Sequence, residues 1–164
     1  MSKENLIDYL DDKKSELIDL RFRDALLAKA VTDIHRYTDK TYMLYVPLTA
    51  ITPIHCIDRE SAIDKVNKRA AILAEHKQAL LQIGKLDKES LLQYLPSVSG
   101  IKVIKEKEGS YISFEGNGRV AAFKQVFDEN DAIELEVEEY QLTDYEKILR
   151  RVDRVRRRNF SDIE

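Results

Sequence analysis

The sequence is poor in the residues that cross-link, interrupt or anchor a chain. Its 164 residues include one cysteine, Cys56, which excludes an internal disulfide and a zinc finger built on cysteines. Only three prolines and five glycines punctuate the chain, without repeats or low-complexity segments. No apolar run reaches the length of a membrane span or resembles a signal peptide. We therefore expect a protein with no membrane partner, located in the cytoplasm.

Charge of one sign is not in large excess, since the net charge is −3. A chain with this balance is not an overall electrostatic binder of nucleic acid. The hydrophobic fraction of 43% is typical of a globular domain, and the charged fraction of 35% predicts long solvated helix faces. The charges are segregated, however. Residues 128–146 contain nine acids and no Lys or Arg, whereas residues 147–158 contain seven bases and one acid.

Hydrophobic periodicity predicts an α+β fold with a small mixed sheet between long N-terminal helices and a C-terminal helix. The predicted helices lie at about residues 3–37, 58–83, 88–94 and 119–127, and from 143 onward. The predicted strands lie at about residues 42–48, 101–105, 111–115 and 133–140. These elements divide the chain into an N-terminal helical extension (1–41), a domain (42–142) with a helical insertion (58–95), and a basic C-terminal helix (143–164).

Several helix ends have residues of the type that terminates or caps a helix. Asp58 and Asp87 stand where an N-cap side chain would accept a backbone hydrogen bond. Gly84 follows the second predicted helix, a position where glycine ends helices. Thr143 and Glu146 have the spacing of a capping box, in which each side chain satisfies a backbone donor of the other residue.

The most informative stretch is a turn between a predicted strand and a predicted helix. Glu115 ends the strand, Gly116, Asn117 and Gly118 form a Gly-x-Gly turn, and Arg119 opens the helix. Glycines let a backbone approach a ligand closely, and the start of a helix offers unpaired N–H groups to an anion. Arginine adds a planar fork for phosphate or carboxylate. The same pattern is also typical of a plain tight connection, and both interpretations stay open.

The order of elements around this turn resembles the core of the ParB/sulfiredoxin superfamily. The resemblance covers about residues 42–140, and the run Tyr45–Ile51 is similar to the first strand of that family. It implies a ParB/sulfiredoxin-like fold, with Gly116 and Arg119 at the positions of a glycine and an arginine that contact phosphate or sulfinate groups. Glu115 matches an acidic position of some members and is the implied catalytic residue.

The turn also departs from the patterns of individual branches of that superfamily. Sulfiredoxins have a cysteine where this chain has Asn117 and a histidine where it has Gly118, so sulfinic acid reduction is not expected. Chromosome-partition members have arginines at the positions of Gly118 and Ala121, and these charges are missing. CTP clamping and sliding on DNA are therefore not implied.

A second signal is the basic run near the C-terminus. Its candidate contacts to nucleic acid are Arg150, Arg151, Arg154, Arg157 and Arg158. Alternatively, these arginines favour the helix dipole and pair with the acidic strand at residues 134–139. This structural interpretation predicts weak, non-specific nucleic-acid binding or none.

Two hypotheses of function remain. In the first, the chain binds a phosphate-bearing molecule, such as a nucleotide with magnesium, at Glu115–Arg119. Any chemistry would then be phosphoryl transfer or hydrolysis of a nucleotide or phosphate ester. In the second, the turn is structural and the helices form a non-catalytic interaction module for protein or nucleic acid.

His55, Cys56 and Asp58 form too small a ligand set for a metal, and we predict none there. The oligomeric state stays open.

Overall fold

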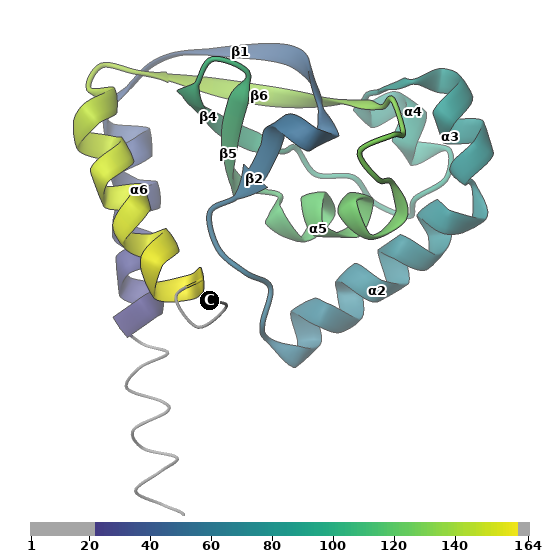
Figure 1. Cartoon of the computed structure of the whole chain (residues 1–164), viewed down its shortest axis with the longest axis horizontal. Coiled ribbons are helices and arrows are strands. Elements are labelled where there is room, and N and C mark those ends of the chain that lie inside the picture. Colours follow the sequence, from purple (N-terminus) through teal and green to yellow (C-terminus); the bar gives the residue numbers. More distant parts are fainter. Residues whose placement is uncertain (1–21, 161–164) are drawn as a thin grey trace, which may run out of the picture.

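The computed structural model describes residues 22–160 and confirms the predicted α+β class with a mixed sheet (Figure 1). Its strands are β1 (Thr38–Pro47), β2 (Ile51–Pro53), β3 (Lys85–Leu86), β4 (Lys102–Lys107), β5 (Ser110–Glu115) and β6 (Glu134–Leu142). Its helices are a helix at residues 22–36, a short 3₁₀ turn at Leu48–Ala50, α2 (Glu60–Glu75), α3 (Lys77–Ile83), α4 (Lys88–Leu92), α5 (Asn117–Val126) and α6 (Tyr145–Phe160). The predicted helix before residue 22 lies outside the described residues.

The sheet has the strand order β1-β6-β4-β5-β2, and the short β3 also pairs with β6. The pairs β1–β6 and β4–β5 are antiparallel, whereas β2–β5, β3–β6 and β4–β6 are parallel. The antiparallel pair β4–β5 is a hairpin formed by the strands predicted at about residues 101–105 and 111–115. Its turn contains Gly109 at φ 74°, a left-handed conformation that glycine adopts without a side-chain clash. Helical crossovers join the parallel neighbours, as parallel pairing requires.

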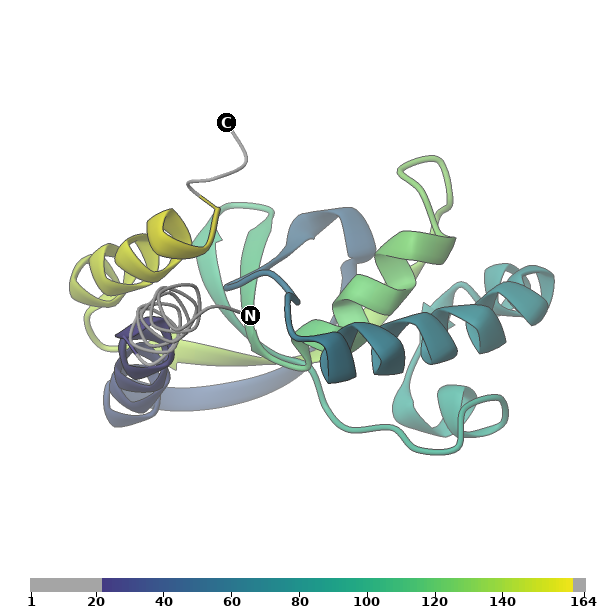
Figure 2. The same ribbon diagram turned by 90° about the horizontal axis from the view of Figure 1, so that it is seen from below.

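Helices cover both faces of the central hairpin (Figures 1 and 2). Successive residues of a strand point to opposite faces, and in β4 both Val103 and Ile104 are fully buried. Val103 belongs to a core that includes Phe123 of α5. Ile104 belongs to a second core with Ile34 and with Val152 of α6. The hairpin is therefore enclosed by α2 and α5 on one side, and by α6 and the helix at residues 22–36 on the other.

The second predicted helix is divided in two, and its predicted cap is wrong. The break between α2 and α3 falls at His76, which has φ −108° and ψ 16° and whose ring packs against Tyr94. Arg59 occupies the N-cap of α2 and makes no side-chain cap. The predicted cap, Asp58, instead accepts a hydrogen bond from Arg23 at 2.7 Å. The Asp58 carboxylate is thus bound in a long-range ion pair and does not cap α2.

The ends of the shorter helices agree better with the sequence. Gly84 follows α3 at φ 74°, and Asp87 caps α4 by accepting a hydrogen bond from the backbone N–H of Ser90 at 2.8 Å, both as predicted. The capping box at α6 is wrong by one residue. Asp144 accepts from the backbone N–H of Lys147 at 3.1 Å, and the Thr143 hydroxyl instead donates to a backbone carbonyl before β1.

The helical spacing of Ile148, Leu149, Val152 and Val155 predicts a narrow apolar stripe on this last helix. In α6 this prediction is confirmed, since Ile148, Val152 and Val155 are buried and Leu149 is partly buried. This stripe packs on the second core and holds the helix against the sheet. No helix in the described part of the chain has both the length and the apolar character needed to cross a bilayer.

Candidate functional site

The predicted turn is one residue long rather than three. β5 ends at Glu115, as predicted, and α5 begins at Asn117, two residues before the predicted start. Gly116 alone makes the turn, at φ 82° and ψ 19°. A Cβ built on Gly116 would lie 3.0 Å from the carbonyl oxygen of Gly100 and 3.0 Å from Cα of Ile101. The glycine is therefore required by its φ and by the close approach of the backbone before β4.

The two central residues of the motif face the interior of the protein. Asn117 is buried, and its side-chain oxygen accepts a hydrogen bond from the buried hydroxyl of Ser113 at 2.6 Å. At Gly118, an added Cβ would meet only a methyl group of Val66 of α2, at 3.7 Å. Neither residue lines the cavity that contains Arg119. The Asn117 amide and Gly118 instead join α5 to β5 and to α2.

Glu115 is part of a charged cluster at the end of β5. It is 43% exposed, and its carboxylate lies 3.0 Å from Nζ of Lys102 and 3.9 Å from Nε2 of His35. The hydrogen bond with Glu115 is the main reason that the pKa of Lys102 is raised, and Tyr140 adds to the effect. Glu115 is therefore held by an ion pair, and Lys102 lines the Arg119 cavity while Glu115 does not.

Arg119 is a buried cation without a full set of partners. The residue is 3% exposed, and its Nε and Nη1 atoms have no hydrogen-bond partner within residues 22–160. Burial lowers the pKa of its guanidinium to about 10, and the nearby positive charge of Arg69 contributes to the same shift. The side chain still carries its charge at neutral pH, because this pKa is well above 7. A buried guanidinium with unpaired N–H groups is rare, because desolvation of a charge costs several kcal/mol.

Arg119 lines a cavity of about 170 Å³ between α5, α4, β1, β6 and the segment before β4. Its apolar walls are Met43, Leu86, Leu91, Val98, Ile101 and Leu135, and its charged residues besides Arg119 are Asp87, Lys88, Lys102, Glu136 and Glu138. None of these three carboxylates is hydrogen-bonded to the unpaired atoms of Arg119. Asp87 is engaged elsewhere, since its two oxygens accept hydrogen bonds from Ser90 and Tyr45.

The five arginines predicted as nucleic-acid contacts separate into two groups. Arg151 forms an ion pair with the buried Asp33, so it belongs to the packing of α6 on the helix at residues 22–36. Arg156 likewise pairs with Glu106 of β4, at 3.1 Å. The structural interpretation had predicted pairing with the glutamates of β6. The acidic partners of Arg151 and Arg156 are Asp33 and Glu106 instead. The remaining four line an open groove of about 530 Å³: Arg150, Arg154, Arg157 and Arg158.

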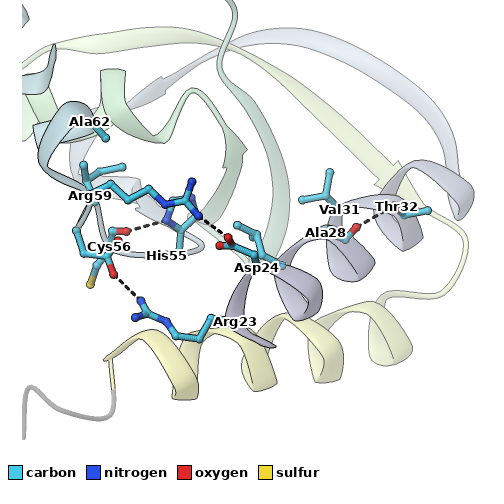
Figure 3. Close-up of a pocket in the computed structure, with 12 residues that line it drawn as sticks. Arg23, Asp24, Ala28, Val31, Thr32, His55, Cys56, Arg59 and Ala62 are labelled. Carbon is cyan, nitrogen blue, oxygen red and sulfur yellow. Dashed lines mark hydrogen bonds and ion pairs between the residues drawn. The ribbon is translucent and has the colours of Figure 1, made fainter. Parts of the chain in front are cut away.

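Sequence reasoning missed a larger cavity, of about 690 Å³, between the helix at residues 22–36 and the chain that leads into α2 (Figure 3). Two reciprocal ion pairs cross it: Arg23 binds Asp58, and Arg59 binds Asp24. Partners of opposite charge, 35 residues apart in both cases, are the only signal of this contact in the sequence. This charge pattern does not identify which residues pair unless the fold is known.

The same cavity contains the histidine and cysteine that were considered as metal ligands. Nδ1 of His55 lies 2.7 Å from the backbone carbonyl oxygen of Cys56, within hydrogen-bond distance (Figure 3). Burial raises the pKa of the Cys56 thiol, which disfavours the nucleophilic thiolate. Within residues 22–160, no group of three or more His, Cys, Asp or Glu side chains is arranged to hold a metal ion.

Comparisons with known proteins provide no relative for this chain. No protein-family model matches the sequence, and no curated protein or solved structure matches it either. The resemblance to the ParB/sulfiredoxin superfamily thus stays a prediction from the sequence.

Proposed function

We propose that the chain binds a phosphate-bearing ligand whose phosphate group enters the Arg119 cavity. The observation that carries the proposal is the buried guanidinium of Arg119, with two nitrogens unpaired within the described residues. An oxyanion would supply the missing acceptors and neutralise the buried charge. The planar guanidinium fork matches two oxygens of a phosphate, and Lys88 and Lys102 add positive charge to the same cavity.

The size of the cavity limits what enters it. Pockets that enclose a whole small molecule measure roughly 300–1,000 Å³, and this cavity of about 170 Å³ is smaller. It has room for one phosphate group and a few water molecules, each of which occupies about 30 Å³ in the liquid. The rest of the ligand would lie at the surface beside Met43, an apolar side chain of β1 that is largely exposed.

The wall carboxylates favour a ligand that brings a cation with it. Glu136 and Glu138 place negative charge in the same cavity as Arg119. A bare phosphate is repelled by these groups, whereas a magnesium-bound phosphate offers the carboxylates a hard cation with an affinity for oxygen ligands. A nucleotide with magnesium therefore remains our preferred ligand class. The metal would arrive with the phosphates, since no group of three or more His, Cys, Asp or Glu side chains within residues 22–160 could hold it alone.

The resemblance of the turn supports the same ligand class. Gly116 and Arg119 match family positions that contact phosphate or sulfinate groups in the ParB/sulfiredoxin superfamily, and we propose a distant variant of that fold for residues 42–142. Gly116 places α5 against the segment before β4, and Arg119 follows on the first turn of α5. Glu115 lies outside the cavity and is bound to Lys102, so we propose binding and assign Glu115 no chemical step.

Calorimetry and thermal unfolding with inorganic phosphate and nucleotides, each with and without magnesium, test the proposal. We expect at least one phosphate compound to stabilise the wild type, by roughly 2.7 kcal/mol at a hundred times its dissociation constant. Arg119→Met should weaken that binding by about 1.5–3 kcal/mol, the usual contribution of a charged hydrogen bond. The matched control is Lys124→Gln, because Lys124 is exposed on the same helix and does not line the cavity. A wild type that no phosphate compound stabilises would contradict the proposal.

A further inference from the structure

One face of α6 is made of arginines, separate from the Arg119 cavity. Arg150, Arg154, Arg157 and Arg158, here called the arginine face, stand at positions i, i+4, i+7 and i+8 of the helix. Residues with this spacing share one side of an α-helix. Together they line the open groove of about 530 Å³. The apolar stripe of α6 is buried against the sheet. The arginine face, on another side of the same helix, therefore points to solvent.

The arginine face makes no ion pair in the described part of the chain, although two acids of α6, Glu146 and Asp153, stand four residues before Arg150 and Arg157. None of its four members forms an ion pair with any residue from 22 to 160, whereas the neighbouring Arg151 and Arg156 do. Arg150 and Arg154, and again Arg154 and Arg158, are like charges four residues apart, an arrangement that destabilises a helix. A bound polyanion would remove this repulsion.

We propose that the arginine face binds single-stranded nucleic acid through its backbone phosphates. Residues 150–158 extend over about 12 Å of helix, at 1.5 Å per residue, and a nucleic-acid strand presents several phosphates over such a length. Four planar guanidinium groups can each take two phosphate oxygens. At the end of the face, the guanidinium of Arg158 lies 4.9 Å from the ring centre of Phe22, whose side chain is half-exposed.

The aromatic contact favours a single strand over a duplex. Proteins that bind single strands combine a basic groove with aromatic or arginine planes on which unpaired bases stack. The guanidinium carbon of Arg158, which lines the groove, lies over the Phe22 ring, so an aromatic plane and an arginine plane stand together there. In the sequence the two residues are far apart, so only the fold brings an aromatic ring to the basic run.

Two other polyanions fit the arginine face less well. An anionic membrane surface is bound most firmly by a helix that also inserts an apolar face, and the apolar stripe of α6 is already buried. An acidic protein would need apolar anchors at the centre of its interface, and within residues 22–160 the groove is lined by the four arginines alone. A strand of nucleic acid needs phosphate contacts and stacking only.

The test is fluorescence anisotropy with a labelled single-stranded oligonucleotide between 50 and 200 mM salt. Four phosphate contacts to a single strand predict about a 50-fold loss of affinity over this range, and two contacts predict about a 7-fold loss. The double variant Arg154→Gln/Arg157→Gln should therefore flatten the salt dependence of the wild type to about 7-fold. Its matched control is Lys65→Gln/Lys68→Gln, which makes the same change in net charge on the exposed side of α2.

Absence of binding at 50 mM salt would overturn the proposal, as would an equal loss in the lysine control. Anionic vesicles that bind more tightly than the oligonucleotide would assign the face to a membrane instead. A duplex of the same sequence bound as tightly as the single strand would refute the role of stacking. Phe22→Leu should weaken single-strand binding several-fold and leave duplex binding unchanged. These results do not depend on Arg119, so failure of one site leaves the other untouched.

Discussion

Arg119 and the arginine face of α6 both lack acidic partners in the described part of the chain, but they have opposite physical consequences. Arg119 is 3% exposed, and its unpaired N–H groups have lost their hydration. The four arginines of α6 line an open groove, where water solvates each guanidinium. A missing partner is costly only where water is excluded. Because it is buried, the unpaired Arg119 is evidence for a specific anionic ligand. The solvated arginine face indicates long-range electrostatic attraction of a polyanion.

The largest expected effect tests the buried side of this comparison. Arg119→Met should raise the free energy of unfolding of the ligand-free protein by about 1–4 kcal/mol, because an apolar side chain of similar length replaces a desolvated charge. Urea unfolding of the two proteins measures the difference. The gain should shrink or reverse when the wild type is saturated with its ligand. A destabilised variant would show that Arg119 has a structural partner after all.

A smaller effect separates Arg151 from its neighbours on the same helix. Arg151→Ala should lower the free energy of unfolding by about 2–3 kcal/mol, because it leaves the buried carboxylate of Asp33 without its partner. Arg150→Ala, one residue earlier on the arginine face, is the matched control and should change stability by less than about 0.5 kcal/mol. Equal effects in the two variants would contradict the division of these arginines into two groups.

The two glycines of the Gly-x-Gly motif provide the next test. Gly116→Ala should cost about 1–2 kcal/mol from the left-handed φ alone, and more from the 3.0 Å approach to the backbone of Gly100 and Ile101. Gly118→Ala should instead stabilise by about 0.5–1 kcal/mol, because Gly118 lies in a helix and has space for a methyl group. Thermal unfolding of both variants should therefore show shifts of opposite sign. Shifts of the same sign would contradict the one-residue turn.

The smallest effect is expected on the arginine face. Arg154→Gln removes two like-charge pairs at four-residue spacing, each destabilising by about 0.2–0.5 kcal/mol. We expect a gain of at most about 1 kcal/mol in stability at low salt that disappears at high salt, since exposed charges are screened. Unfolding curves at two salt concentrations measure it. A gain that persists in high salt would show that the groove is not solvated.

The sequence was sufficient where local chemistry determines the structure. Alternation of apolar residues with glutamate predicted β6, and the spacing of Ile148, Val152 and Val155 predicted the buried stripe of α6. It was insufficient where distant residues compete for one group. The Arg23 guanidinium takes Asp58 from the start of α2, and a carbonyl before β1 takes the Thr143 hydroxyl. Such competition depends on the tertiary fold.

The candidate site shows the same limit. The motif drew attention to Arg119, but its other members have separate roles, since Asn117 bonds to Ser113 and Glu115 to Lys102. The cavity walls come from segments distant in sequence, so no local pattern could indicate them. The burial of Arg119 was also not predictable, because arginine on the first turn of a helix is usually exposed.

The enclosure of the β4–β5 hairpin on both faces has a consequence for the local stability of the protein. Amide hydrogens exchange with solvent through local openings, and the slowest belong to strands that only global unfolding exposes. Val103 and Ile104 lie in β4, which is hydrogen-bonded between β5 and β6 and covered on both sides. Their amides should be among the last to exchange for deuterium. In residues 96–100, which precede the buried Ile101 and border the Arg119 cavity, four of the five residues are exposed, so these amides should exchange earlier than those of the hairpin.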